Sequence, residues 1–280
     1  MQSKKYVLIT GATSGIGLQT AKGLISKGFL VFGTSRSAQK EDAAKKILGD
    51  DFHFIRGDLS SRESLEAIAD QAKKHLNDGG LYALINNAGT FFSRKALSVD
   101  GIDMPFAVNT IAPFYLSQLL YQNLRMTKGR IINVTSSSHY RTKINWNDIQ
   151  LAKHYGQLKA YKQTKAFSVL LSRKFNEYSP SVKMYMADPG LVSTEIGFKN
   201  TSALGKLVWS HRKNIGQTVE QGASTSVFLT SEESLPDDLY FKYSKPMPSS
   251  KATQSPENAQ KIWDYFIKLY GINPLDYIRG

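Results

Sequence analysis

Short apolar and β-branched runs alternate with longer amphipathic stretches through most of the chain. The runs predict strands at 6–10, 30–35, 52–56, 82–86, 130–135 and 182–187. The amphipathic stretches predict helices at 16–27, 38–48, 61–76, 104–126 and 158–177. Because parallel strands need crossover helices between them, this alternation predicts an α/β fold, with a doubly wound parallel sheet covered by helices on both faces.

The alternation stops after the last of these strands. The stretch 193–217 mixes glycines, lysines and apolar residues without a clear period. A helix is expected again at 218–231, where Thr218 and Gln221 have the spacing of a capping box. A short strand near 239–243 and a final helix near 256–270 complete the prediction. No linker-like composition or repeat divides residues 1–280, so we expect a single domain.

Composition narrows the kinds of site that the chain can carry. It has no cysteine, which excludes disulfides, thiolate metal sites and a cysteine nucleophile, and we predict no metal. The net charge of +13 is spread along the chain without an arginine-rich block, so solvated basic faces and a phosphorylated cofactor explain it better than nucleic acid does. No apolar run approaches the roughly 18 residues of a membrane span, and the apolar run at 6–9 is too short for a signal peptide. We therefore expect a soluble cytoplasmic protein.

A glycine-rich turn joins the first predicted strand to the first helix. It reads Thr10-Gly-Ala-Thr-Ser-Gly-Ile-Gly17, with the spacing Gly-x-x-x-Gly-x-Gly. Glycines allow a sharp turn and a close backbone approach, and the following helix N-terminus presents free N–H groups to an anion. Glycine turns also occur in ordinary strand–helix connections. The position after the first strand favours binding of a dinucleotide pyrophosphate.

The end of the second predicted strand indicates which dinucleotide is bound. In a doubly wound fold this position faces the adenosine ribose, and an acidic residue there binds the 2′-hydroxyl of NAD. This chain has Arg36 instead, which suits the 2′-phosphate of NADP. Asp58, after the third strand, is expected either to accept from the adenine amino group or to help cap the helix that starts near Ser61.

A tyrosine and a lysine lie one turn apart at the start of the helix predicted at 158–177. An ammonium near the Tyr161 hydroxyl would favour its phenolate and suit it to acid–base chemistry, and Lys165 has the right spacing. Tyr155 and Lys159 have the same spacing, so spacing alone does not choose between the pairs.

The order of the motifs along the chain resembles that of the short-chain dehydrogenase/reductase family, and this resemblance favours Tyr161 and Lys165. The resemblance covers residues 6–195 and implies a Rossmann-type fold. It rests on the glycine turn, Asp58, Asn86-Asn-Ala-Gly89, Asn109, a serine after the fifth strand, Tyr-x-x-x-Lys and Pro189-Gly190. The family's catalytic helix usually reads Tyr-x-x-Ser-Lys, and Thr164 before Lys165 fits that pattern whereas Leu158 before Lys159 does not.

The resemblance implies both catalytic and cofactor-binding residues. Its catalytic set is Asn109, Ser136, Tyr161 and Lys165. The cofactor, NADP, would contact Gly11, Thr13, Ser14, Gly15, Ile16, Gly17, Arg36, Asp58, Leu59, Asn87, Ala88, Gly89, Tyr161, Lys165, Pro189, Gly190, Val192 and Thr194.

Each catalytic residue has an implied role. Ser136 and Tyr161 would donate to a carbonyl oxygen as hydride arrives, and Tyr161 would then act as general acid, or as base in reverse. Lys165 would hold the nicotinamide ribose, and Asn109 would position a water or satisfy a helix kink. Ser137 and Ser138 would tie up the turn after the fifth strand.

Finer matches resemble the retinol dehydrogenase and WW-domain oxidoreductase branch. They are the 25-residue step from Ser136 to Tyr161, the Gln221-Gly-Ala223 helix and the tail from Tyr240 to Ile272. Two features depart from the branch, since no membrane anchor is seen and Asp188 replaces the histidine that commonly precedes Pro-Gly. Both count against retinoids as the substrate.

We expect an NADP(H)-dependent oxidoreductase acting on a lipophilic aldehyde, ketone or alcohol. The stretch 193–217 would close the site as a lid, with Leu204, Leu207 and Trp209 as pocket lining or as ordinary core. Its basic residues suit either water or an anionic membrane surface, and the family resemblance implies a homo-oligomer paired through 104–126 and 158–177. The alternatives are a non-catalytic NADP-binding regulator and a basic binder of membranes or nucleic acid.

Overall fold

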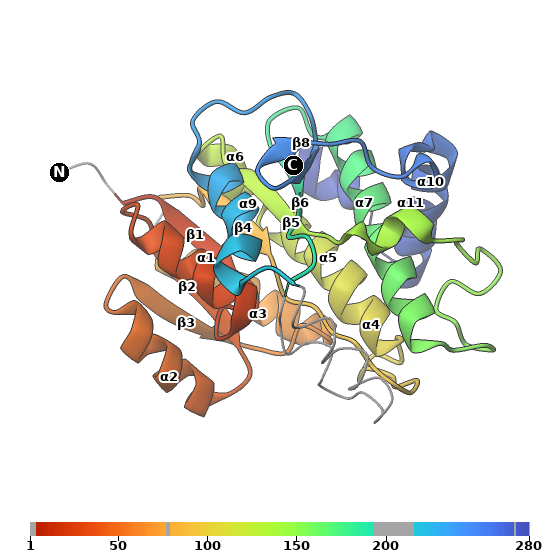
Figure 1. Cartoon of the computed structure of the whole chain (residues 1–280), viewed down its shortest axis with the longest axis horizontal. Coiled ribbons are helices and arrows are strands. Elements are labelled where there is room, and N and C mark those ends of the chain that lie inside the picture. Colours follow the sequence, from red (N-terminus) through yellow and green to blue (C-terminus); the bar gives the residue numbers. More distant parts are fainter. Residues whose placement is uncertain (1–3, 77–78, 193–215, 272, 280) are drawn as a thin grey trace.

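The computed structural model describes residues 4–76, 79–192, 216–271 and 273–279. Within these residues the strands form one eight-stranded sheet in the order β3-β2-β1-β4-β5-β6-β7-β8 (Figure 1). All neighbouring strands are parallel except the last pair, which is antiparallel. The strands are β1 (Tyr6–Ile9), β2 (Leu30–Ser35), β3 (Phe52–Arg56), β4 (Ala83–Asn86), β5 (Arg130–Val134), β6 (Lys183–Asp188), β7 (Tyr240–Lys242) and β8 (Lys245–Pro246).

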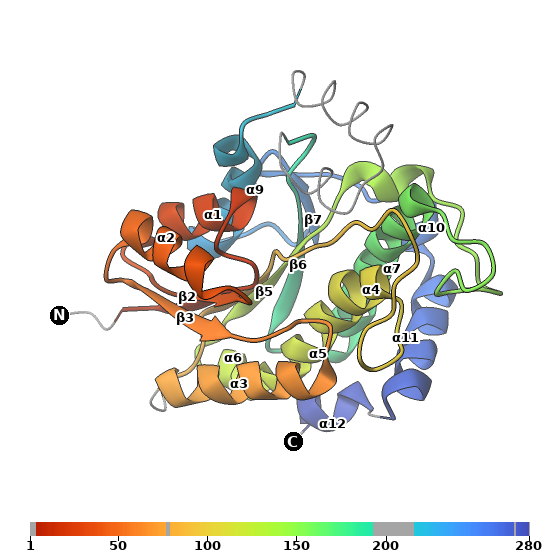
Figure 2. The same ribbon diagram turned by 90° about the horizontal axis from the view of Figure 1, so that it is seen from below.

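Helices cover both faces of the sheet (Figure 2). One face carries α1 (Gly15–Ile25), α2 (Ala38–Leu48) and α9 (Val219–Ser231). The other carries α3 (Arg62–Leu76), α4 (Met104–Phe106), a π-helical turn η1 (Ala107–Ile111), α5 (Ala112–Leu119), α6 (Tyr121–Met126), α7 (Gln157–Tyr178), α11 (Pro256–Tyr270) and α12 (Pro274–Arg279). A 3₁₀ turn η2 (Ser137–Arg141) follows β5, and α10 (Lys251–Gln254) precedes α11.

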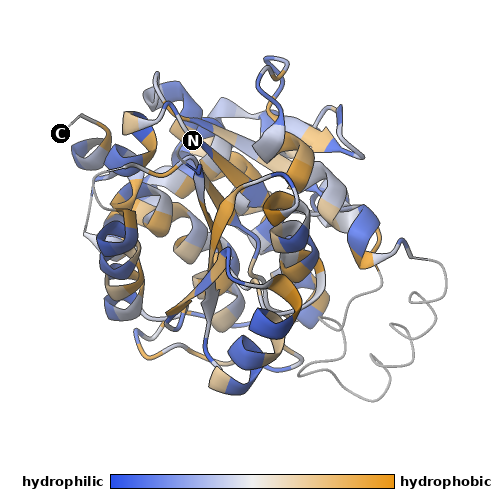
Figure 3. Ribbon diagram, turned by 90° about the vertical axis from the view of Figure 1, so that its left-hand side faces the viewer, coloured by the Kyte–Doolittle hydropathy of each residue, from blue (hydrophilic) through white to orange (hydrophobic). Residues whose placement is uncertain are grey.

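The sheet separates two apolar cores. Figure 3 shows hydrophobic strands between helix layers whose outer surfaces are hydrophilic. One core joins the sheet to α3, α5, α7 and α11 around Trp263, and the other joins it to α1, α2 and α9 around Phe241. Central strands such as β4 are buried on both faces, which is why they read as continuous apolar runs in the sequence. The predicted single-domain, doubly wound fold is confirmed.

The helix predicted at 104–126 is wrong as a single element. The chain there is divided into α4, η1, α5 and α6. Pro113 has no N–H to donate to the carbonyl of Asn109, so a regular α-helical bond is lost at that turn. The Asn109 side chain also bonds the backbone of Thr90, accepting from its N at 2.7 Å and donating to its O at 3.0 Å. Both features favour the π-helical turn, a local form common at functional sites.

The C-terminal third matches its predicted elements with additions. The capping box of α9 is present, since Thr218 Oγ1 accepts from Gln221 N and Gln221 Oε1 accepts from Thr218 N. The short elements β8, α10 and α12 were not predicted, and neither was η2 after β5, because all four are too brief to show a hydrophobic period. Most of the predicted lid, at 193–215, lies outside the described residues. In the part of the chain that the structure describes, no helix has the length and apolarity of a membrane span.

Candidate active site

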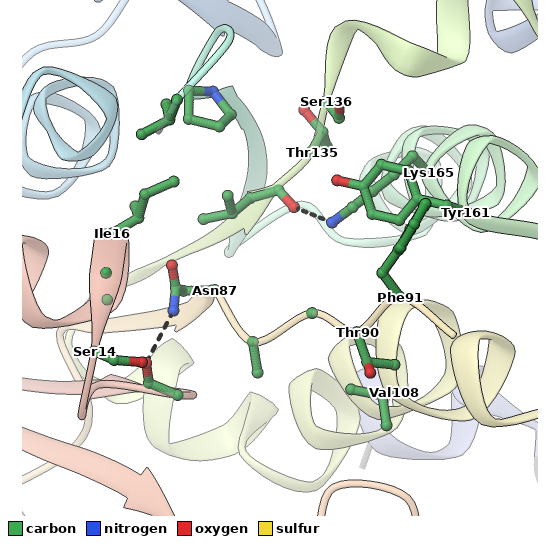
Figure 4. A pocket seen from close by; sticks show the side chains of 18 of the residues that line it. Ser14, Ile16, Asn87, Thr90, Phe91, Val108, Thr135, Ser136, Tyr161 and Lys165 are labelled. Atoms are coloured by element: carbon green, nitrogen blue, oxygen red, sulfur yellow. Dashed lines mark hydrogen bonds between the residues drawn. The ribbon is translucent and has the colours of Figure 1, made fainter. Parts of the chain in front are cut away.

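A cleft of about 1340 Å³ opens at the carboxyl ends of the parallel strands. It runs over the point between β1 and β4 where the strand order reverses, which is where doubly wound sheets bind ligands. One end is formed by the glycine turn and the end of β2, and the other by the residues after β5 and the start of α7. Figure 4 shows Ser14 and Ile16 at one side and Ser136, Tyr161 and Lys165 at the other, with Asn87 in between.

The glycine turn is braced by the chain segment after β4. Asn87 Nδ2 donates to Thr10 O at 2.9 Å and to Gly11 O at 3.2 Å, and Thr10 Oγ1 accepts from Asn87 N and Ala88 N, both at 3.0 Å. A Cβ at Gly17 would lie 2.3 Å from Gly11 O and 2.4 Å from Asn87 Nδ2. The turn therefore has room only for glycine at this position, and its backbone is held open for a ligand above the N-terminus of α1.

The end of the cleft at β2 carries cations. The Arg36 side chain is 72% exposed, and its Nη1 lies 3.8 Å from Asp58 Oδ2. Lys40, four residues further along the chain and in the first turn of α2, also lines the cleft. The Asp58 carboxylate lines the cleft while its Oδ1 accepts from Ser60 N and Ser60 Oγ, each at 2.9 Å. Asp58 thus shapes the turn before α3, whereas Ser61 Oγ accepts from Ser64 N at 3.4 Å in the capping position.

The other end holds the Tyr161–Lys165 pair on α7. Both side chains line the cleft, with the Lys165 ammonium 5.8 Å from the centre of the Tyr161 ring (Figure 4). Lys165 Nζ donates to Val134 O at 2.8 Å, which fixes the ammonium at the end of β5. Phe91 packs edge-on against the Tyr161 ring, with the centroids 5.3 Å apart.

Burial controls the protonation of this pair. It raises the pKa of the Tyr161 hydroxyl to about 12, against the lowering effect of a hydrogen bond with Ser136. It lowers the pKa of the Lys165 ammonium to about 8. The negative charge of Asp188 raises both values. Tyr161 is therefore protonated at neutral pH and Lys165 is mostly so, which is the state needed to donate a proton.

Ser136 stands between the end of β5 and η2. Its Oγ accepts from Ser138 N at 3.2 Å, so the predicted catalytic serine itself caps the 3₁₀ turn. Ser250 N donates to His139 Nε2 at 3.2 Å, so the other ring nitrogen, Nδ1, carries the proton and donates to Ser136 O at 2.7 Å. The backbone of Ser136 is thereby held from both sides, and its hydroxyl remains at the cleft.

Asn109 is 2% exposed and does not line the cleft. Besides its two bonds to Thr90, its Nδ2 donates to Thr164 Oγ1 at 3.2 Å. Its side chain therefore joins the segment after β4 to the helix that carries Tyr161. Of the two roles expected for Asn109, satisfying a helix kink agrees with this geometry.

The remaining predicted residues fall into three groups. Those that line the cleft are Thr13, Ser14, Gly15, Ile16, Leu59, Ala88, Gly89, Pro189, Gly190 and Val192. Thr194 lies outside the described residues. Tyr155, the rival of Tyr161, lies before α7, is not among the residues that line the cleft, and donates its hydroxyl to Phe92 O at 2.8 Å.

Two features of the site were missed from the sequence. Lys40 lines the cleft from the first turn of α2, and its closeness to Arg36 in the sequence, just after the second strand, was a signal that could have been used. Asp188 is fully buried and accepts hydrogen bonds from Ser137, Tyr240 and Gly190. No local pattern reveals its bonds to Ser137 and Tyr240, because they join β6 to the turn after the neighbouring strand β5 and to the neighbouring strand β7.

Comparison with known proteins gives the same family. The model of the short chain dehydrogenase family matches residues 5–204. Retinol dehydrogenase 12 of Mus musculus is 32% identical over 278 residues, covering 96% of this chain and 87% of that protein.

Two solved structures show the same fold. One, of an uncharacterized protein from Mycobacterium paratuberculosis, has a TM-score of 0.75 at 23% identity, covering 96% of this chain and 94% of that one. The other, of the NADPH-bound carbonyl reductase from chicken fatty liver, has a TM-score of 0.65 at 24% identity, covering 88% and 99%. The protein belongs to the short-chain dehydrogenase/reductase family, in its retinol dehydrogenase branch, and is an oxidoreductase that uses a nicotinamide cofactor.

Proposed function

We propose that the protein is an NADPH-dependent reductase of lipophilic aldehydes or ketones, acting in reverse as an alcohol dehydrogenase. The observation that carries the proposal is the placement of the Ser136 and Tyr161 hydroxyls at one end of the cleft, beside the buried Lys165 ammonium. Two hydroxyl donors in this arrangement can bind a carbonyl oxygen and stabilise the charge that develops on it.

A bound nicotinamide cofactor supplies or accepts the hydride. Tyr161 donates the proton to the carbonyl oxygen in reduction and accepts it from the alcohol in oxidation. Lys165, whose ammonium is held by Val134 O, would bind the ribose of the cofactor and return a proton to Tyr161. Ser136 orients the substrate oxygen, and Asn109 keeps the segment carrying Thr90 against α7.

The preference for NADPH rests on charge at the β2 end of the cleft. Arg36 and Lys40 both line it there, and two cations suit a 2′-phosphate better than a 2′-hydroxyl. The carbonyl reductase from chicken liver, which shares the fold, binds NADPH.

The preference for lipophilic substrates rests on the wall beside Tyr161. That wall presents Phe91, Phe92, Met104, Val108 and Leu158. A substrate with an apolar body would bury these side chains and gain about 25 cal/mol for each Å² removed from water. The relative from mouse is named for retinol, an alcohol of this lipophilic kind.

Cofactor oxidation against a panel of aldehydes and ketones tests the proposal. The absorbance of NADPH is followed with short, long and aromatic carbonyls, and each run is repeated with NADH. We expect turnover with NADPH and long-chain or aromatic carbonyls. NADPH binding without turnover on any carbonyl or alcohol would instead indicate the non-catalytic regulator.

A further inference from the structure

Asp188, the last residue of β6, is a fully buried carboxylate beside the site. Ser137 Oγ donates to its Oδ2 at 2.5 Å, Tyr240 OH donates to the same oxygen at 2.6 Å, and Gly190 N donates to Oδ1 at 2.9 Å. All three neighbours act as donors, an arrangement that suits the ionised carboxylate.

A cation completes the network from outside. Lys242 Nζ donates to Ser137 Oγ at 3.0 Å. Since Ser137 accepts from the ammonium, its own hydroxyl proton is free to point at Asp188. The order of donors is therefore fixed from Lys242 through Ser137 to Asp188. Lys242 lines the cleft, so the network reaches from the buried carboxylate to the ligand space.

Each contact of Asp188 holds a different part of the site. Ser137 follows Ser136 directly, so its bond fixes the turn after β5. Gly190 has φ +76°, and its bond fixes the Pro189-Gly190 turn that lines the cleft. A Cβ at Gly190 would lie 2.8 Å from the Tyr243 ring, so the turn has room only for glycine at this position.

We propose that Asp188 is a positioning residue that ties the serine turn to the Pro189-Gly190 turn and provides the buried negative charge beside Tyr161 and Lys165. The kinetic effects expected of Asp188 rest on the proposed function, whereas its expected effect on the titration of Lys165 does not.

The charge of Asp188 acts on five titratable groups, which are His139 and Tyr140 from η2, Tyr161 and Lys165 from α7, and Tyr240 from β7. Lys242 reaches Asp188 through Ser137, and Arg173 acts on His139. Burial lowers the pKa of the Lys165 ammonium to about 8, and the charge of Asp188 opposes that shift. Without Asp188, the pKa of Lys165 falls further and that of Tyr161 also falls.

The substitution Asp188→Asn tests the charge, because it keeps the shape and an acceptor oxygen. The readout is NMR titration of the protein, without cofactor, carrying [ε-¹³C]lysine, with the Lys165 signal assigned from Lys165→Met. We expect the Lys165 titration to move to lower pH by about half a unit or more. An unchanged Lys165 titration in a folded Asp188→Asn protein would overturn the proposal.

Two further variants separate charge from structure. Glu41→Gln is the matched control, since Glu41 is another buried carboxylate but pairs with Arg56 near the far edge of the sheet, and it should leave Lys165 unmoved. Asp188→Ser removes the same charge with a smaller side chain and should also move the Lys165 titration to lower pH. If Asp188→Asn does not fold, an unchanged Lys165 titration in Asp188→Ser refutes the proposal.

Kinetics then test the positioning role. Alcohol oxidation needs deprotonated Tyr161, so kcat for this reaction should rise with pH. In Asp188→Asn the alkaline-rising limb of this pH profile should move to lower pH. Ser137→Ala keeps the charge of Asp188 and removes the hydrogen bond between the two residues. It should therefore lower kcat at least tenfold without moving the alkaline-rising limb of the pH profile. A limb that stays in place in an active Asp188→Asn enzyme would contradict the inference, whereas an inactive unaltered protein would contradict only the proposed function.

Discussion

Replacing Arg36 with aspartate should weaken the binding of NADPH relative to that of NADH. The Arg36 guanidinium is 72% exposed at the end of β2, and its only described ionic partner is Asp58 at 3.8 Å. Lys40 provides a second cation at this end of the cleft. The perturbation removes one cation, adds one anion and leaves the buried strand unchanged.

The size of the effect follows from three contributions. A charge-assisted contact between Arg36 and a 2′-phosphate is worth about 1.5–3 kcal/mol. Releasing Arg36 from Asp58 costs up to about 1 kcal/mol, because both side chains are exposed. The new carboxylate repels the phosphate by about 1 kcal/mol at 4 Å in water, which offsets that release. Arg36→Asp should therefore weaken NADPH about tenfold to a hundredfold.

The assay is fluorescence titration of NADPH and NADH with the unaltered protein and the variant. Arg125→Asp makes the same change of charge on α6, outside the cleft lining, and should leave both affinities unchanged. NADH should bind Arg36→Asp at least as tightly as it binds the unaltered protein. Equal affinities of the unaltered protein for NADH and NADPH would refute the reasoning.

Three further perturbations test other parts of the account. Gly17→Ala places a Cβ 2.3 Å from Gly11 O, so NADPH affinity should fall more than tenfold with an unchanged circular dichroism spectrum; normal binding would show that the turn is not the phosphate site. Thr218→Ala removes the capping box of α9 and should lower the unfolding free energy in urea by about 1 kcal/mol, whereas no change would mean that the cap is dispensable. Along straight-chain aldehydes, kcat/KM should rise up to about fourfold per methylene until the pocket is full, and a flat profile would contradict an apolar pocket.

The strands could be predicted closely from the sequence because buried parallel strands are apolar throughout. All six strands predicted before residue 190 match β1 to β6 within one residue at either end. The helix at 104–126 could not be divided correctly, because its π turn depends on bonds between Asn109 and Thr90, 19 positions away. Hydrophobic period reports which face is buried and carries no information on such side-chain bonds.

The candidate site likewise has features that the sequence predicts locally and others that depend on contacts between distant residues. The glycine turn and the Tyr161–Lys165 pair are local patterns whose geometry follows from strand and helix spacing, and the structure brings them to one cleft. The bonds of Asp188 to Ser137 and Tyr240 span 51 and 52 positions. They exist only because β5, β6 and β7 lie side by side, so the sequence alone showed an unusual aspartate without its partners.

The central claim is that Tyr161 is the proton donor, and Tyr161→Phe tests it most directly. The change removes one hydroxyl and keeps the ring that packs against Phe91. We predict that kcat falls about a hundredfold to ten-thousandfold, while the NADPH dissociation constant stays almost unchanged. Tyr155→Phe, which removes a hydroxyl bonded to Phe92 O instead, should keep most of the activity. A Tyr161→Phe enzyme that retains most of its kcat would contradict the account.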